Sequence, residues 1–179
     1  TVALQLRSDN VIHSFWVPQL TYKRDTMPGE ENVLYMRADE AGVYRGLCAE
    51  FCGVQHGKMM LVVVVQEPEE FDAWLNRVQQ DALEPIGDEA LAGRAVFANV
   101  GCAGCHAVRG TEAQGQLGPD LTHLASRLTL GAAIMPNTRG YLGGWIVNPQ
   151  ALKPGNYMPA QNLASDDLQN LLTYLEQLK

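Results

Sequence analysis

Residues 44–59 read YRGLCAEFCGVQHGKM, a stretch that holds two cysteines, a histidine and a methionine. A second histidine, His13, stands upstream in VIHSFW. Thiolate, imidazole and thioether ligands together favour copper over hard cations. A mononuclear blue-copper site needs one cysteine, so the presence of both Cys48 and Cys52 is explained if their thiolates bridge two copper ions. Each copper would then take one histidine, which leaves Met59 and a backbone carbonyl between the cysteines for the two weak positions.

Three other interpretations of this cluster are open. A disulfide between Cys48 and Cys52 would close a short loop and add little stability, and it would leave the histidines without a role. A Cys2His2 zinc site is chemically sound, but it predicts no redox function. A thioredoxin-type copper-delivery protein also uses a Cys-x-x-x-Cys pair, but it requires a βαβ alternation that this half of the chain lacks. The dinuclear copper site accounts for the most residues.

The copper-type cluster lies among short β-type runs. These runs cover residues 1–7, 32–37, 42–46 and 59–66, and segments with proline and glycine separate them. The pattern predicts a small antiparallel sandwich or barrel. The longest apolar run, Met59–Val65, is far shorter than the roughly 20 residues that cross a bilayer.

The periodicity becomes helical after the last strand. One helix face is predicted from the spacing of four apolar side chains, Phe71, Trp74, Leu75 and Val78. Residues 81–87, DALEPIG, then break the pattern. We therefore place a linker at 81–87, between a first domain at 1–80 that ends in this helix and a second domain at 88–179.

The second domain is predicted to be all-α. A helix is expected over Asp88–Asn99, followed by a glycine-rich middle and a terminal helix. Ser165, followed by two aspartates, is the expected cap of that terminal helix. Its apolar face is formed by Leu168, Leu171, Leu172 and Leu175.

The other two cysteines form the motif Cys102-Ala103-Gly104-Cys105-His106, the Cys-x-x-Cys-His pattern of c-type haem attachment. The two thiols add to the haem vinyl groups, and the adjacent histidine becomes the proximal iron ligand. A redox-active Cys-x-x-Cys would need a thioredoxin-like context, and half a zinc site would need a further cysteine or histidine pair nearby. Neither is present, so we predict a covalent haem c.

The second axial ligand is a choice between two methionines, each followed by proline. Methionine opposite histidine raises the haem potential. Met158 lies in an irregular loop just before the final helix, whereas Met135 lies in the glycine-rich middle. We choose Met158 and interpret Met135 as a pocket-wall or loop residue.

Composition narrows the functional classes. The 179 residues carry a formal net charge of −7, and both halves hold more acidic than basic residues, which disfavours nucleic acid as a partner. The chain opens directly in a strand-like alternation with no signal segment, so we expect it to be a fragment of a longer protein that is anchored in a membrane by a segment missing here.

Residues 11–20 (VIHSFWVPQL) together with 44–59 closely resemble the copper-bearing CuA domain of cytochrome c oxidase subunit II, which has a cupredoxin fold. The resemblance covers most of residues 1–68. It implies Cys48 and Cys52 as bridging thiolates. It assigns His13 and Met59 to one copper, and His56 with the Glu50 main-chain carbonyl to the other. It also implies that the Glu50 side chain reaches a magnesium ion at the border with the catalytic subunit.

Residues 88–179 resemble a class I cytochrome c domain, in which a loop methionine before the last helix ligates iron. The resemblance implies that the first helix, with Gly93 and Phe97, crosses the last near Leu171 and Tyr174. It also implies that Gly118-Pro119-Asp120-Leu121 contacts the proximal histidine. The expected fold is therefore a two-domain α+β chain, an antiparallel cupredoxin-like sandwich followed by an all-α cytochrome c domain.

The combined resemblance implies the electron-entry subunit of a respiratory haem-copper oxidase. Electrons would pass from an external donor, such as a cytochrome c or a quinol-oxidising complex, through haem c and CuA to catalytic subunit I, on the periplasmic side of the membrane. Oxygen reduction would occur on that other subunit. The same module in a nitric oxide reductase, a copper-binding assembly protein and a zinc-binding module are the alternatives.

Four conspicuous side chains are not assigned to a site. His123 is interpreted as a surface or propionate-side residue, Trp145 as part of the haem pocket wall, and Trp74 as part of its helix's apolar face. Trp16, close to His13, either guides electrons or belongs to the core.

Overall fold

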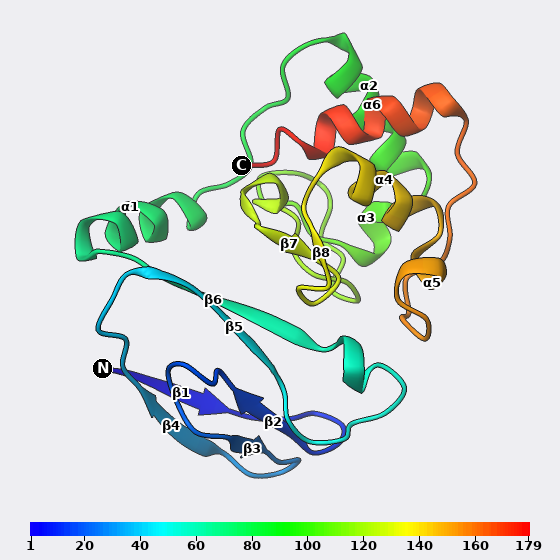
Figure 1. Cartoon of the computed structure of the whole chain (residues 1–179). Helices are drawn as coiled ribbons and strands as arrows, with labels where there is room; N and C mark the ends of the chain where they lie inside the picture. The colour runs from blue at the N-terminus through cyan, green and yellow to red at the C-terminus, as the bar shows by residue number, and fades with distance from the viewer. The chain divides into compact units, whose positions relative to one another are not determined.

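A computed structural model describes residues 1–179. The chain divides into two compact units (Figure 1). The first contains residues 1–72 with the short segments 131–134 and 153–155, and the second contains 73–130, 135–152 and 156–179. The first unit holds the larger sheets and the second holds most of the helices, as expected for a mixed fold.

The first unit is antiparallel. Its strands are β1 (Val2–Leu6), β2 (His13–Trp16), β3 (Arg24–Thr26), β4 (Asn32–Met36), β5 (Gly42–Cys48) and β6 (Met60–Val65). A four-stranded sheet has the order β3-β2-β5-β6, and β1 pairs with β4 in a second sheet. The four predicted β-type runs are confirmed. The sequence did not show β2 and β3, because their short segments gain strand character from pairing with each other and, for β2, with β5.

Alternation in β4 places the core of this unit. Leu34 and Met36 are buried while Val33 and Tyr35 between and beside them are exposed, which is the period of two expected of a strand covered on one face. Val17, directly after β2, is also fully buried. The core of this unit therefore includes one face of β4 and the residue that directly follows β2.

The predicted helix after the strands is α1 (Pro68–Val78). Pro68 opens it, and Glu69 and Glu70 lie in its first turn, where negative charge favours the helix dipole. The helix is amphipathic, but none of its residues is buried. Trp74 lies on the predicted apolar face and is 37% exposed, so this face is not part of a core.

The predicted linker is tied to the second unit. Ala82 N donates to Arg109 O at 3.0 Å. Ile86 N donates to Gln177 Oε1 at 2.8 Å, and Gln177 Nε2 donates back to Ile86 O at 3.0 Å. Residues 82–86 are therefore ordered on the helical unit.

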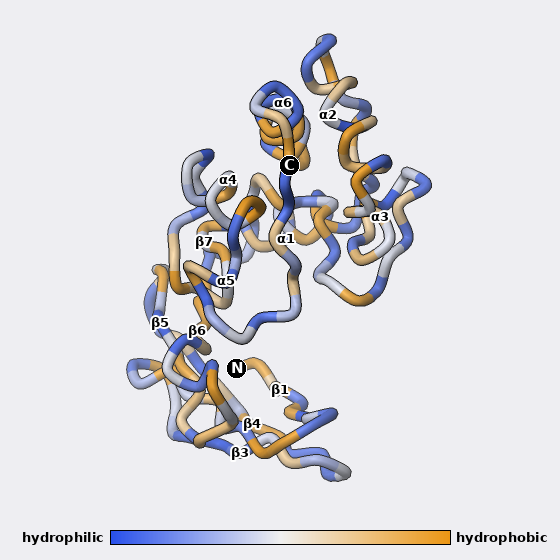
Figure 2. Tube along the Cα trace, turned by 90° about the vertical axis from the view of Figure 1, so that its right-hand side faces the viewer, coloured by the Kyte–Doolittle hydropathy of each residue, from blue (hydrophilic) through white to orange (hydrophobic).

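The second unit is built on two crossing helices, α2 (Asp88–Asn99) and α6 (Ser165–Leu175). Figure 2 shows hydrophobic and hydrophilic segments alternating along α2. The predicted crossing is confirmed: a Cβ built on Gly93 would lie 2.0 Å from Asn170 O, and the Phe97 and Tyr174 rings meet edge to face at 5.8 Å. Backbone contact of this closeness requires glycine at position 93.

Shorter elements complete this unit. They are α3 (Cys102–Cys105), η2 (Leu124–Ser126), β7 (Thr129–Leu130), β8 (Met135–Pro136), α4 (Arg139–Val147) and α5 (Pro149–Leu152). The β7–β8 pair was not predicted, because two-residue strands leave no period in a sequence. The predicted cap at Ser165 is wrong: Ser165 is the first helical residue, Ala164 occupies the N-cap, and no side chain caps it. None of the helices is long and apolar enough to cross a membrane.

We predict that Gly93→Ala destabilises the helical unit. The added methyl group would overlap the Asn170 carbonyl, and overpacking of this kind costs about 1–3 kcal/mol, more than the roughly 1 kcal/mol that alanine gains over glycine in a helix. Thermal unfolding followed by circular dichroism measures the loss. Gly140→Ala is the matched control, because no atom lies within 4 Å of its Cβ position, and an equal Tm for the two variants would contradict the packing argument.

Candidate functional site

The first candidate site is a pair of sulfur atoms. Cys48 ends β5 and Cys52 follows in the next loop, and their Sγ atoms are 3.7 Å apart with both cysteines free. Pairing of Phe15 with Cys48 between β2 and β5 brings His13 to the same place. The ligand atoms of His13, Cys48 and Cys52 all lie within 4.8 Å of one another. The separation excludes a disulfide in this structure, since bonded sulfurs lie about 2.05 Å apart.

Three further donors surround the sulfur pair. Cys52 Sγ lies 3.7 Å from His56 Nδ1 and 3.7 Å from Met59 Sδ, because the turn η1 (His56–Lys58) folds both residues back toward it. Cys48 Sγ lies 3.2 Å from the Glu50 main-chain oxygen. All six predicted copper ligands are thus gathered in one place. The Glu50 side chain is exposed, so it is free to face a separate partner.

Asn10 fixes the orientation of His13, and the sequence analysis missed it. His13 Nε2 lies 2.9 Å from Asn10 Oδ1, so Nε2 carries the proton and the Nδ1 lone pair is directed toward Cys48 Sγ at 3.9 Å. Asn10 Oδ1 also accepts from the adjacent Val11 N at 2.7 Å, a local contact that restricts the orientation of the amide. An outer hydrogen bond of this kind is typical of metal-binding histidines. The sequence signal for this contact was the position of Asn10, three residues before the candidate ligand His13.

The thiols have a protected environment. Cys48 is buried, and desolvation raises the pKa of the Cys52 thiol, with further increases from the hydrogen bond and charge of Cys48. A metal binding here must therefore displace protons from sulfur. Two thiolates, two imidazole nitrogens, a thioether and a carbonyl oxygen form a soft donor set that suits copper.

The second candidate site surrounds the Cys-x-x-Cys-His motif. Cys102 and Cys105 lie one turn apart in α3, and His106 follows at its end. His106 Nδ1 donates to Pro119 O at 2.8 Å, which confirms the predicted contact and leaves Nε2 for a metal. Burial raises the pKa of the Cys102 thiol. The arrangement fits a haem held by two thioethers and one imidazole.

Gly118 allows the His106 ring to reach its position. A Cβ at Gly118 would lie 2.4 Å from His106 Cε1 and 2.6 Å from its Nδ1. The peptide at 118 is itself held by a 2.7 Å hydrogen bond from Gly118 N to Cys105 O. The loop therefore lies directly against the imidazole.

The two candidate methionines differ in environment. Met135 is in β8 and only 5% exposed, whereas Met158 is half-buried in the loop before α6. Met158 N donates to Asn156 Oδ1 at 2.9 Å, which fixes the local turn of that loop. Met158 as the second axial ligand remains a prediction.

The other conspicuous residues have structural contacts. Trp16 is half-buried with Lys23 Nζ 5.7 Å from its ring centroid, and Trp145 is half-buried in α4. His123 is also half-buried, and its Nε2 lies 3.1 Å from Gln80 O.

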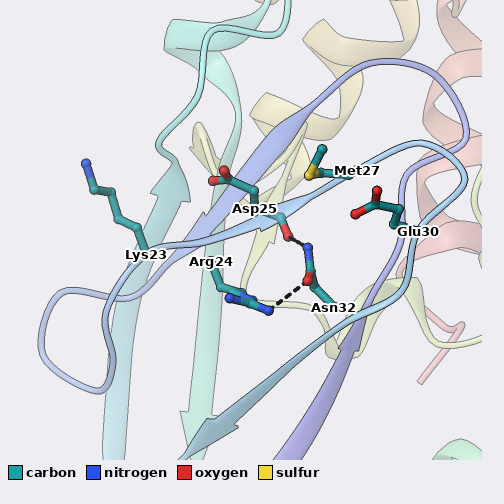
Figure 3. A pocket seen from close by; sticks show the side chains of 6 residues that line it. All are labelled: Lys23, Arg24, Asp25, Met27, Glu30 and Asn32. Atoms are coloured by element: carbon teal, nitrogen blue, oxygen red, sulfur yellow. Dashed lines mark hydrogen bonds between the residues drawn. The ribbon is translucent and has the colours of Figure 1, made fainter.

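A surface hollow on the first unit does not coincide with either site. It is lined by Lys23, Arg24, Asp25, Met27, Glu30 and Asn32 (Figure 3). Its polar groups are paired with one another: Arg24 Nη2 donates to Asn32 Oδ1 at 2.7 Å, and Asn32 Nδ2 donates to Asp25 O at 2.9 Å. None of the predicted ligands lines it.

Comparison with known families agrees with both sites. A profile described as "Cytochrome C oxidase subunit II, periplasmic domain" matches residues 1–66. A second, described as "Cytochrome c", matches residues 90–179. The chain belongs to the cytochrome c family through residues 90–179, and this domain follows a region that matches the periplasmic domain of subunit II. The subunit II domain implies CuA copper and the cytochrome c domain implies haem c, in agreement with the donors described above.

Individual relatives match this chain over nearly its whole length. Cytochrome c oxidase subunit 2 of Alkalihalophilus pseudofirmus is 41% identical over 179 residues, which is 99% of this chain and 52% of that protein. Subunit 2 of Bacillus subtilis is 29% identical and is matched over 99% of this chain and 53% of its own length. The chain thus spans about half the length of these relatives.

A solved structure is similar to the subunit II domain. The periplasmic domain of subunit II of cytochrome oxidase (CoxB) of Bradyrhizobium japonicum is 32% identical, with a TM-score of 0.42, over 43% of this chain and 56% of that one.

We predict that Gly118→Ala lowers the yield of chain that carries haem. The new methyl group would displace the His106 imidazole, at a cost of about 1–3 kcal/mol, before the ring can ligate iron. Haem absorbance per protein, measured after expression with haem maturation, gives the yield. Gly104→Ala is the control within the same motif, because its Cβ position has nothing within 4 Å, and similar losses in both variants would argue against the His106 contact.

Proposed function

We propose that this chain is the electron-transfer subunit of a respiratory haem-copper oxidase. It accepts electrons from an external donor through haem c, passes them to CuA and delivers them to the catalytic subunit, where oxygen is reduced. The observation that carries this proposal is the presence of two redox ligand sets on one chain: a cluster of three sulfur, two nitrogen and one oxygen donors, and a Cys-x-x-Cys-His motif with its histidine held by Pro119. A storage or delivery protein has no need of the second set.

We assign the copper pair to the sulfur cluster. Cys48 and Cys52 bridge the two ions, His13 with Met59 serves one, and His56 with the Glu50 carbonyl serves the other. Bound there, the dinuclear copper supplies one-electron transfer. The protein holds the donors in place through β2, β5 and the turn η1, so a change of redox state requires little movement of ligands.

We assign haem c to the second unit. Cys102 and Cys105 attach it, His106 Nε2 is the proximal ligand and Met158 is the opposite one. The Pro119 carbonyl holds the imidazole in one orientation and one tautomer. With both axial positions filled by protein, this site is suited to electron transfer rather than to oxygen binding.

The partners follow from this assignment. Catalytic subunit I receives the electron, and Glu50 contributes a magnesium ligand at the border with it, which its exposed side chain allows. The donor is a cytochrome c or a quinol-oxidising complex. Covalent haem and copper thiolates would support a location on the periplasmic face of the membrane, and we propose that the complete protein is anchored in that membrane.

We predict two copper ions per haem in the reconstituted chain. Metal analysis gives the ratio, and electron paramagnetic resonance of the oxidised protein is expected to show one electron shared over two copper nuclei. His56→Ala removes the Nδ1 that lies 3.7 Å from Cys52 Sγ and is expected to abolish this signal, while His123→Ala, a histidine away from the cluster, leaves it intact. A single localised copper in the wild-type chain would sink the dinuclear assignment.

We predict that Met158→Leu alters the haem and Met135→Leu does not. Loss of a thioether ligand removes the far-red iron–sulfur absorption band and lowers the haem potential. Leucine and methionine are similar in volume, so the buried Met135 site should lose less than about 1.5 kcal/mol of stability. Optical spectra of the two variants decide between the methionines, and disappearance of the band only in Met135→Leu would reverse the assignment.

A further inference from the structure

The carbonyl that orients His106 belongs to a turn with its own supports. Pro119 O accepts from His106 Nδ1 at 2.8 Å, but proline has no N–H with which to anchor its own peptide. The turn is held instead by its neighbours: Gly118 N donates to Cys105 O at 2.7 Å, and Leu121 N donates to Ala107 O at 2.8 Å. The position of the carbonyl therefore depends on the residues on both sides of Pro119.

Asp120 forms the centre of these supports. Its Oδ1 accepts from Thr122 N at 2.7 Å, which closes a local turn directly after Pro119. Its main-chain oxygen accepts a hydrogen bond from Arg127 Nη2. Its Oδ2 lies 3.5 Å from Arg109 Nε. One aspartate thus fixes the turn through both its side chain and its backbone.

The partners of Asp120 are themselves fixed. Thr122 is fully buried, and its Oγ1 accepts from Arg109 N at 2.9 Å. Arg109 Nη2 also donates to Val78 O at 2.5 Å, so the guanidinium has a second anchor. Loss of the Asp120 carboxylate would leave the Thr122 N–H without its acceptor in a buried environment, which favours a rearrangement of the turn.

The Asp120 carboxylate is charged at neutral pH. Burial acts to raise its pKa, but the hydrogen bonds from Thr122 and the charges of Arg109 and Arg127 outweigh burial and lower it. The side chain is 48% exposed, so this effect is screened by solvent and its value to overall stability is small. The lowered pKa acts locally, because it keeps the Asp120 carboxylate ionised as the acceptor for Thr122 N.

We propose that Asp120 is a positioning residue for His106, because it closes the turn that holds the Pro119 carbonyl against the imidazole and thereby lowers the haem reduction potential. A strong hydrogen bond at Nδ1 makes the imidazole a more basic ligand, which favours the oxidised iron. The inference rests on the proposed ligation of haem iron by His106. It adds a residue that touches neither haem iron nor the imidazole.

The test compares four variants of the haem-bearing 179-residue chain. Asp120→Ala removes the acceptor, Asp120→Ser retains a weaker one, and Asp120→Asn retains the amide oxygen while losing the charge. Glu112→Ala is the charge control, because it removes an exposed carboxylate from a nearby loop. The haem potential is measured by optical redox titration, and exchange of the His106 Nδ1 proton with D2O is followed by nuclear magnetic resonance.

We expect the haem reduction potential to be lowest in Asp120→Asn, higher in Asp120→Ser and highest in Asp120→Ala. Relative to Asp120→Asn and Glu112→Ala, Asp120→Ala should increase the ratio of reduced to oxidised haem roughly threefold at fixed ambient potential, or about 28 mV at 59 mV per tenfold. Exchange of the Nδ1 proton should be roughly fivefold faster. A role in stability alone would change the Tm and leave these two measurements at the Asp120→Asn values.

Every outcome decides the inference. Equal potentials and exchange rates in Asp120→Ala and Asp120→Asn would overturn it while leaving the proposed function intact. If Asp120→Ala fails to retain haem, the comparison of Asp120→Ser with Asp120→Asn is read in the same way. Absence of covalent haem from the wild-type chain would overturn the proposed function and this inference together.

Discussion

The approach of two cysteine sulfurs to 3.7 Å without a bond is the constraint on which the first unit depends. Cys48 is the last residue of β5, and the loop that follows brings Cys52 back to it. Pairing with β2 then brings His13 to the pair, and the turn at 56–58 folds His56 and Met59 back. Two thiolates this close repel each other, and a metal ion that binds both sulfurs offsets that repulsion.

The second unit also depends on two close approaches, and glycine makes both of them possible. A flat imidazole must lie against a loop, and a helix must cross another at backbone distance. Both are achieved by omitting side chains, at Gly118 under His106 and at Gly93 against Asn170. Hydrogen bonds then set the orientation of the ring: the Pro119 carbonyl fixes the direction of the imidazole, and the Asp120 turn fixes the carbonyl.

Both candidate sites share one principle of construction. In each, a histidine is oriented by a hydrogen bond from its remaining ring nitrogen: His13 through Asn10 and His106 through Pro119. A local backbone N–H supports each acceptor: Val11 N donates to Asn10 Oδ1, and Thr122 N closes the turn after Pro119 by donating to Asp120 Oδ1. Rigid ligands suit electron transfer, because every ligand movement on reduction would slow it.

The candidate ligands and the order of the two domains could be predicted from the sequence, because the chemistry of Cys-x-x-x-Cys and Cys-x-x-Cys-His depends on spacing within single turns or loops. The sequence also placed the α2–α6 crossing through Gly93 and Phe97. Four features became visible only in the folded chain: strands β2 and β3, the cap of α6, and the supporting contacts of Asn10 and Asp120. The reason is physical: pairing partners and hydrogen-bond acceptors are chosen by proximity in space, and polar residues in loops carry no periodic signal of the atoms that they will meet.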